Sequence, residues 1–172
     1  MENITHPAFE EKPGAARFNA AKLSPAGYHA LLGLEKFLHE CSVEVPLLHL
    51  IKLRASQING CAFCLDMHWK DLRAIGETEQ RLYALDAWRE SPFYSDRERA
   101  ALAWTEAVTL VASSHVPQEI YEYARTQLSE KELSDLTIAI ATINAWNRLS
   151  IASRAVPGIY QPAGTQLEKK GA

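Results

Sequence analysis

The stretch LLHLIKLRASQINGCAFCLDMHWKDL, residues 47–72, combines a helical pattern with two closely spaced cysteines. In its first half, apolar residues recur every three or four positions between Leu47 and Ile58, which predicts a helix. Asn59-Gly60 interrupts the pattern. A second helix is expected to begin at or near Cys61 and to run to Gly76, because glycine commonly follows the last residue of a helix. The stretch therefore predicts two consecutive helices, the second of which begins with a cysteine.

The two cysteines and a histidine of this stretch fall on one face of the second helix. Cys61, Cys64 and His68 stand at positions i, i+3 and i+7. Cβ atoms three residues apart on a helix are roughly 5–6 Å from each other, so the two sulfurs could join after a modest adjustment. Free N–H groups at a helix start favour a thiolate, and a histidine one turn after Cys64 could act as its base or ion-pair partner. This arrangement predicts Cys64 as a nucleophile and Cys61 as the thiol that resolves it.

Two other interpretations of the same residues stay open. The cysteines could pack in the core as apolar side chains, since cysteine is often buried. A closed zinc site needs four donors, and the stretch offers four: His49, Cys61, Cys64 and His68. Three of them lie within two turns of one helix, whereas structural zinc sites usually draw on separate elements. We therefore expect no bound metal, and we keep zinc as a minor alternative.

Helical patterns continue on both sides of this stretch. Ser24 followed by Pro25 predicts a helix start, because serine is a preferred cap and proline suits the first turn. That helix places most of its apolar residues on one face. A short helix is expected over residues 78–88 and another over residues 117–128. No segment shows the alternation or the Val- and Ile-rich runs that strands require.

Two capping boxes predict the starts of longer helices. Ser95 with Glu98 should begin a helix that reaches about Ser113, and Ser129 with Glu132 should begin a long helix that ends near residue 157. The sequence thus predicts an all-α fold of one domain. We divide the chain into an irregular arm (residues 1–17), a helical domain (residues 18–156) and a loose tail (residues 157–172).

Length and composition favour a single globular domain and exclude some classes of partner. The chain has 172 residues, of which 47% are hydrophobic and 23% charged. A net charge of −3 gives no electrostatic reason to bind nucleic acid, and no apolar run approaches the roughly 18 residues of a membrane span. The first 18 residues lack the apolar segment of a signal peptide, so we expect a cytoplasmic protein. In that reducing compartment a close cysteine pair is more often catalytic or metal-binding than structural.

Three segments of the chain resemble a known family. They are LHLIKLRASQINGCAFCLDMHWKDLR (residues 48–73), RLYALDAWRESPFYSDRERAALAWTEAVTL (residues 81–110) and TINAWNRL (residues 142–149). Together they resemble the alkylhydroperoxidase D-like (AhpD-like) branch of the carboxymuconolactone decarboxylase superfamily, over roughly Phe18 to Val156. The resemblance implies an all-α bundle that assembles into trimers or hexamers. It also implies an active site with a Cys-x-x-Cys pair, a downstream histidine and an upstream glutamate.

Carried over by this resemblance, Cys64 is the cysteine that attacks a peroxide, Cys61 the one that resolves it, and His68 the relay histidine. Two positions depart from the family pattern. The family's glutamate, twelve residues before the first cysteine, is His49 here, and the histidine that some members hold before the second cysteine is Phe63. A histidine can still pass a proton, because its ordinary pKa lies near 6.5. We therefore keep His49 as the second member of the relay.

Three functions follow from these residues. The first is a cofactor-free dithiol peroxidase of the alkyl hydroperoxide reductase type, recycled by a thioredoxin-like or lipoyl-bearing reductant. The second is a cofactor-free lactone decarboxylase or isomerase, a lyase chemistry that has no evident need for two thiols. The third is a non-enzymatic redox sensor whose disulfide reports oxidant. We favour the peroxidase; the sequence separates it from the lyase better than from the sensor.

A few further residues carry weaker expectations. Asn144, Asn147 and Arg148 take nearby positions on the long helix, and Asn147 or Arg148 could face the dithiol pocket. Hydrogen bonding between helices and subunit contact are the favoured interpretation. Trp69, next to His68, is a candidate for the mouth of the pocket, with no preference for or against that position. The remaining tryptophans are expected to anchor the core or an interface: Trp88, Trp104 and Trp146.

Overall fold

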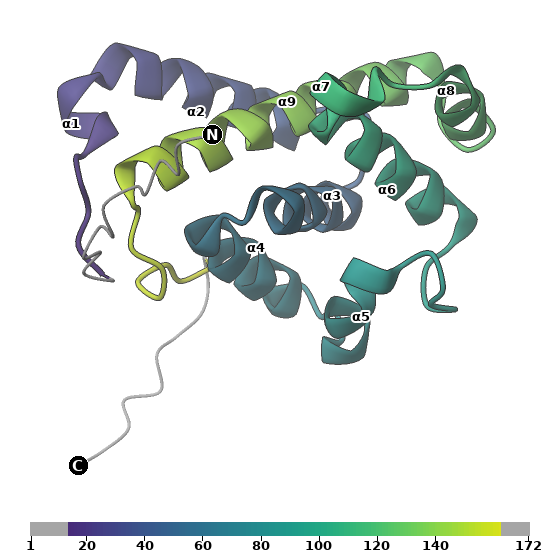
Figure 1. Ribbon diagram of the computed structural model, residues 1–172, viewed down its shortest axis with the longest axis horizontal. Coiled ribbons are helices and arrows are strands. Elements are labelled where there is room, and N and C mark those ends of the chain that lie inside the picture. Colours follow the sequence, from purple (N-terminus) through teal and green to yellow (C-terminus); the bar gives the residue numbers. More distant parts are fainter. Residues whose placement is uncertain (1–13, 163–172) are drawn as a thin grey trace, which may run out of the picture.

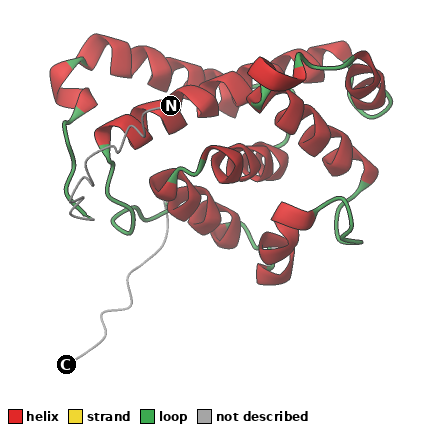
Figure 2. Cartoon of the chain, viewed as in Figure 1, coloured by secondary structure: helices red, strands yellow, loops and turns green. Residues whose placement is uncertain are grey.

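The computed structural model describes residues 14–162, and every regular element in that range is a helix (Figures 1 and 2). This confirms the all-α prediction. The helices are α1 (Ala20–Leu23), α2 (Pro25–His39), α3 (Val45–Asn59), α4 (Ala62–Ala74), α5 (Glu79–Ala84), the 3-10 turn η1 (Leu85–Ala87), α6 (Asp96–Thr109), α7 (Val111–Ser114), α8 (Gln118–Arg125) and α9 (Glu130–Ser153). None of the helices in the described range combines the length and the apolar character needed to cross a bilayer.

Helix α3 lies at the centre of the fold (Figure 1). It packs against α4, α6 and α9, and α2 lies along α9 on the outside. Leu50, Ile51 and Leu53 of α3 are fully buried, and Ala55 extends the buried surface toward the start of α4. Because its neighbours cover α3 on several sides, a side chain on α3 can reach a cavity only between two of those neighbours.

Local sequence signals determine where several helices begin. The boxes Ser95–Glu98 and Ser129–Glu132 both form, with reciprocal side-chain and backbone hydrogen bonds, as predicted. Ser24 does precede α2, but its side chain makes no capping hydrogen bond, so proline alone favours that start.

Helix ends differ from the predictions by a few residues. The helix that begins at Asp96 stops at Thr109, and residues 111–114 form a separate turn that ends at His115 in a left-handed conformation. Helix α9 ends at Ser153, four residues before the predicted end, because Arg154 adopts a left-handed backbone. Helix α1 was not predicted; it has only four residues and no buried side chain.

The segments that flank the helical domain are attached to it. Arg17 donates its backbone N–H to the carbonyl of Ser153 at 2.8 Å. In the first part of the predicted tail, residues 157–162, Gly158 donates its N–H to Asp66, and the Tyr160 hydroxyl donates to Asp71 at 2.6 Å. The other parts of the predicted arm and tail, residues 1–13 and 163–172, lie outside the described residues.

Helix α2 buries only part of its apolar face. Leu38 is 2% exposed, whereas Leu34 and Phe37 are each 39% exposed. Apolar side chains that stay in contact with water on a helix surface often mark a contact with another chain. The face therefore agrees with the expected homo-oligomer, which stays a prediction.

Candidate active site

The turn between α3 and α4 positions the cysteine pair. Gly60 has a left-handed backbone, with φ at 68°, and closes α3 by donating its N–H back into the last turn. The chain then enters α4 with Cys61 as the cap, whose sulfur accepts the backbone N–H of Cys64 at 3.4 Å. This agrees with the predicted helix start at or near Cys61. The sulfur of Cys61 thus lies at the positive end of α4.

Cys61 and Cys64 are joined as a disulfide, with Cα atoms 5.4 Å apart. Each residue is only 1% exposed. Ala55 and Ile143 bury the pair from α3 and α9, and Phe63 and Trp146 pack on the outside of this cluster. A bond this deep is shielded from bulk water, so any reacting molecule must approach through a pocket.

A pocket of about 560 Å³ lies beside Cys64. Residues of α2, α3, α4 and α9 line it, together with Tyr160 and Pro162 from the segment after α9. The side chains in its wall that can react or ionise are Cys64, His49, His68, Asp71, Glu35 and Lys52. Tyr28, Leu32, Met67 and Trp146 supply apolar surface. The pocket is thus mixed, with one thiol, ionisable groups and an apolar wall.

Two histidines and a carboxylate lie together in this wall. His68 on α4 is buried, and its ring centroid lies 5.9 Å from that of His49 on α3. Asp71 Oδ2 lies 3.6 Å from Nδ1 of His68 and 3.8 Å from Nδ1 of His49, too far for a hydrogen bond. Within the described residues, neither nitrogen of His68 has a hydrogen-bond partner. The Tyr160 hydroxyl fixes Asp71 from the other side.

Burial keeps both histidines neutral near pH 7. It lowers the pKa of His49 to about 4, with the neighbouring His68 adding to the effect. Burial likewise lowers the pKa of His68, although nearby Asp71 opposes this. For Asp71 burial would raise the pKa, but His68 and the Tyr160 hydroxyl outweigh burial and leave the pKa below its ordinary value. A neutral imidazole next to a carboxylate can accept a proton and be stabilised once charged.

A partly buried ion pair completes the pocket. Lys52, one turn after His49 on α3, is 6% exposed and lies 2.6 Å from a carboxylate oxygen of Glu35 on α2. The other oxygen of Glu35 accepts the indole N–H of Trp146 at 3.0 Å. The pocket therefore does contain a glutamate, but α2 supplies it rather than the α3 position that His49 holds.

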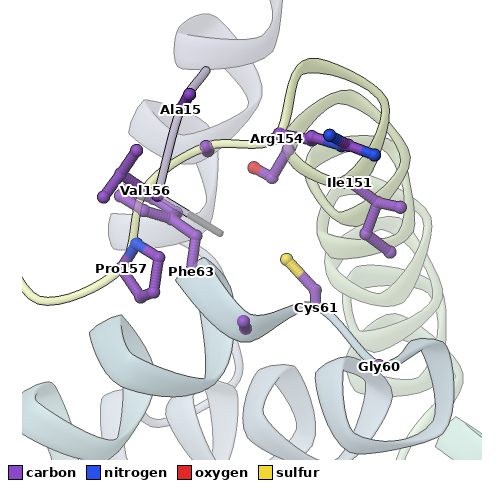
Figure 3. Close-up of a pocket in the computed structure, with 12 residues that line it drawn as sticks. Ala15, Gly60, Cys61, Phe63, Ile151, Arg154, Val156 and Pro157 are labelled. Atoms are coloured by element: carbon purple, nitrogen blue, oxygen red, sulfur yellow. The ribbon is translucent and has the colours of Figure 1, made fainter. Parts of the chain in front are cut away.

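The structure brings three of the four predicted site residues into one pocket: Cys64, His49 and His68. Cys61 lines a different pocket of about 410 Å³ (Figure 3). The stick view shows the Cys61 side chain extending into the space between the end of α9, near Arg154, and the residues Phe63 and Pro157. The chemical roles of the four residues stay predictions.

Sequence reasoning missed four residues of the pocket. Asp71 had a readable signal, because it stands three residues after His68 and continues the stripe of Cys64 and His68 on α4. Lys52 had a weaker one, three residues after His49. Glu35 and Tyr160 had none, because they come from segments distant in sequence and only the fold brings them to the site.

Other predicted residues occupy different places. Asn59 donates its side-chain N–H groups to Asn144 and Asn147, and Asn147 donates to Ser56, which confirms hydrogen bonding between helices for the two asparagines. Trp69 packs on the core and against Tyr83 and is absent from the pocket wall.

Trp88 and Trp104 are buried in the core, as predicted. Trp146 instead contributes to the wall of the pocket beside Cys64. Its indole N–H donates to the partly buried carboxylate of Glu35, which also pairs with Lys52, and this hydrogen bond helps to hold the ring there.

A divalent metal has one possible set of donors among the described residues. Donor atoms of His49, His68 and Asp71 all lie within 4.8 Å of one another. The four-donor zinc site considered from the sequence is not the one assembled here, since its two cysteines are bonded to each other. The expected absence of a bound metal stays a prediction.

The sequence and the fold of the chain match those of known proteins. Residues 25–107 match the carboxymuconolactone decarboxylase family. The chain is 46% identical over 136 residues to the uncharacterised protein YdfG of Bacillus subtilis (strain 168), covering 79% of this chain and 92% of that protein. A crystal structure from Agrobacterium tumefaciens, of a protein of unknown function proposed to be the antioxidant defence protein AhpD, superposes with a TM-score of 0.82 at 42% identity. It covers 85% of this chain and all of that one.

The chain belongs to the carboxymuconolactone decarboxylase family. Its similarity to the Agrobacterium structure places it in the AhpD-like branch of that superfamily. A more distant solved structure, the debrominase Bmp8, has a TM-score of 0.69 at 23% identity, and the match covers 78% of this chain and 73% of Bmp8. Likeness at that level shows a shared fold alone. The carboxymuconolactone decarboxylase fold thus occurs in a protein with a chemistry other than peroxide reduction.

Proposed function

We propose that this protein is a cofactor-free dithiol peroxidase that reduces an alkyl hydroperoxide or hydrogen peroxide. One observation carries the proposal: Cys64, bonded to Cys61, shares a pocket with two neutral histidines. A thiol needs a proton acceptor to become the nucleophilic thiolate, and the pocket supplies two imidazoles and a carboxylate behind them. Membership in the AhpD-like branch supports the same reaction class.

The reaction begins with both cysteines reduced. His68 takes the proton of the Cys64 thiol, directly or through a water molecule, and Asp71 stabilises the imidazolium that forms. The Cys64 thiolate attacks one peroxide oxygen, the O–O bond breaks, and Cys64 becomes a sulfenic acid. The leaving alkoxide or hydroxide takes the proton from His68 and departs as alcohol or water.

The Cys61 thiol then condenses with the sulfenic acid, which forms the disulfide and releases water. Its sulfur is held one helical turn away at a very high effective concentration, so this step should outpace further oxidation of Cys64. A dithiol reductant supplies two electrons and restores both thiols. His49 serves as the second proton carrier, in the position where the family has glutamate.

The wall of the pocket favours an organic peroxide. Tyr28, Leu32 and Met67 offer apolar surface, and the charge of Lys52 is neutralised by Glu35. A volume of about 560 Å³ leaves room for an alkyl group beside the reacting oxygens. An uncharged alkyl hydroperoxide should therefore react faster than hydrogen peroxide at equal concentration.

The proposal extends to partners and location. The reductant is a thioredoxin-like or lipoyl-bearing partner, the protein acts in the cytoplasm, and it assembles as a trimer or hexamer. The exposed apolar face of α2 supports the assembly. The proposal includes no nucleic-acid partner and no membrane partner. The lyase and sensor alternatives are decided by experiment.

Cysteine variants test the proposal. Cys64→Ser should abolish peroxide consumption, whereas Cys61→Ser should react once and accumulate a sulfenic acid that dimedone traps. Cys41→Ser is the matched control, because Cys41 is a half-buried free thiol outside both pockets. One equivalent of peroxide should consume two thiols per parent chain.

Three other results would change the proposal, and the last two would contradict the peroxidase. Full activity in Cys64→Ser with loss in Cys61→Ser would exchange the two cysteine roles. A parent protein that forms the disulfide once but shows no turnover with any dithiol reductant would be the sensor. Decarboxylation of a lactone that persists in the Cys61→Ser/Cys64→Ser double variant would favour the lyase.

A further inference from the structure

The two sulfurs of the disulfide face different pockets. Cys64 lines the pocket of the histidines, and Cys61 lines the second pocket, formed by residues 14–15, the start of α4 and the chain from Ser150 to Pro157. Phe63 and Ser150 line both pockets and so lie between them. Figure 3 shows the Cys61 side chain pointing into the second pocket, with Ile151 and Arg154 on one side of it. A molecule in either pocket thus meets one sulfur.

The burial of Cys61 restricts what can reach it. The residue is 1% exposed, so a thiol fixed on the surface of another protein would be stopped at the rim. A pocket of about 410 Å³ can admit a thiol at the end of a narrow, flexible chain. Arg154, a cationic residue, is among those that line this pocket.

We propose that a small dithiol, free or carried on a slender arm, enters this second pocket and attacks the sulfur of Cys61. The inference rests on the proposed function, and it assigns the reducing half of the cycle to a site separate from the oxidising half. The reductant thiolate forms an S–S bond with Cys61, the Cys61–Cys64 bond breaks, and its electron pair leaves on Cys64. The second thiol of the reductant then displaces Cys61 from the mixed disulfide and leaves as a cyclic disulfide.

The direction of attack fits the surroundings of the two sulfurs. In thiol–disulfide exchange the better-stabilised thiolate is the better leaving group. Cys64 departs into the pocket that holds His68, which lies one helical turn further along α4. The proton that Cys64 then needs can come through the same relay that removed it. Attack at Cys61 therefore returns Cys64 directly to the state that reacts with peroxide.

A matched pair of substitutions separates the two pockets. Ile151 lines only the Cys61 pocket and is 46% exposed; Ile75 lines only the Cys64 pocket and is 47% exposed. Replacing each by tryptophan narrows one pocket and leaves the buried core untouched. Ala62→Phe, at an exposed position of the Cys61 pocket, is a second way to narrow it, and circular dichroism checks that all variants fold.

The reducing half-reaction is measured on protein oxidised with diamide, so that it does not depend on any peroxide activity. Dihydrolipoamide is the reductant, and thiol release is followed by rapid alkylation and mass spectrometry. Ile151→Trp and Ala62→Phe should slow reduction at least tenfold relative to the parent, and Ile75→Trp should stay within twofold. With a peroxide as oxidant of the reduced protein, Ile75→Trp should be the slow variant.

The attacked sulfur can also be identified directly. Diamide-oxidised protein is mixed with excess 2-mercaptoethanol, quenched with iodoacetamide and fragmented in the mass spectrometer. The mercaptoethanol adduct should be on Cys61 and the alkyl group on Cys64.

Two outcomes overturn the inference. One is an adduct on Cys64; the other is slow reduction of Ile75→Trp with normal reduction of Ile151→Trp and Ala62→Phe. If the diamide-oxidised protein behaves as expected but no peroxide oxidises the reduced protein, the inference stands and the peroxidase proposal fails.

Discussion

Replacing His49 by glutamine should make the protein less sensitive to mild acid. Burial lowers the pKa of His49 in the folded protein to about 4, against an ordinary value of 6.5. In the unfolded chain the same imidazole is exposed to water and binds a proton more readily. Acid therefore favours the unfolded chain.

The sign and the size follow from this difference. Above pH 6.5 neither state holds the proton, so the stability is fully present; it is lost as the pH falls from 6.5 toward 4. Each pKa unit corresponds to about 1.4 kcal/mol. Between pH 7.5 and pH 4.5, protonation of His49 in the unfolded chain alone should remove about 2.5 kcal/mol from the free energy of unfolding.

Urea unfolding followed by tryptophan fluorescence measures this effect. Parent and His49→Gln are compared at both pH values. His68, whose pKa is also lowered by burial, is present in both proteins, so its contribution to the pH dependence cancels in the comparison. The drop in the free energy of unfolding should be smaller by about 2.5 kcal/mol in His49→Gln. His29→Gln, on the exposed side of α2, should show the drop of the parent. If His49→Gln loses as much free energy as the parent, His49 does not titrate as a buried, neutral group.

Three further outcomes are expected. Asn147→Ala should lower the free energy of unfolding by about 1–3 kcal/mol in urea titrations, because Asn59 and the buried Ser56 each lose a hydrogen-bond partner. As the control, Arg148→Ala, at the exposed neighbouring position, should change it by less than about 0.5 kcal/mol. Light scattering should give a multiple of the 19.2 kDa chain, reduced in Leu34→Glu; a parent mass of one chain would exclude the oligomer. Elemental analysis of protein purified without added metal should find no stoichiometric zinc; zinc that disappears in Cys64→Ser would show the opposite.

The sequence predicted those features that depend on neighbouring residues. The two capping boxes, the break at Gly60 and the stripe of Cys64 and His68 are local patterns, and each has its expected geometry. Helix ends were less accurate, because a left-handed backbone is uncommon for an arginine and its residue type gave no signal of the end of α9 at Arg154.

The missed parts of the site come from contacts between distant segments. Tyr160 reaches Asp71 across 89 positions of the chain, and Trp146 reaches Glu35 across 111. No periodicity links such pairs, since each partner looks like an ordinary surface residue within its own segment. The same reason explains why residues 157–162 were expected to be loose.

The division of the disulfide between two pockets has a consequence for how relatives can diverge. The stretch that matches the family, residues 25–107, contains the bonded pair Cys61 and Cys64 and the two pocket histidines, His49 and His68. Much of the wall around Cys61 lies outside it, in residues 14–15 and in the chain from Ser150 to Pro157. On the proposed division of labour, substitutions there would change which electron donor the protein accepts and would leave the cysteine pair and its histidines, which lie in the matched stretch, unchanged.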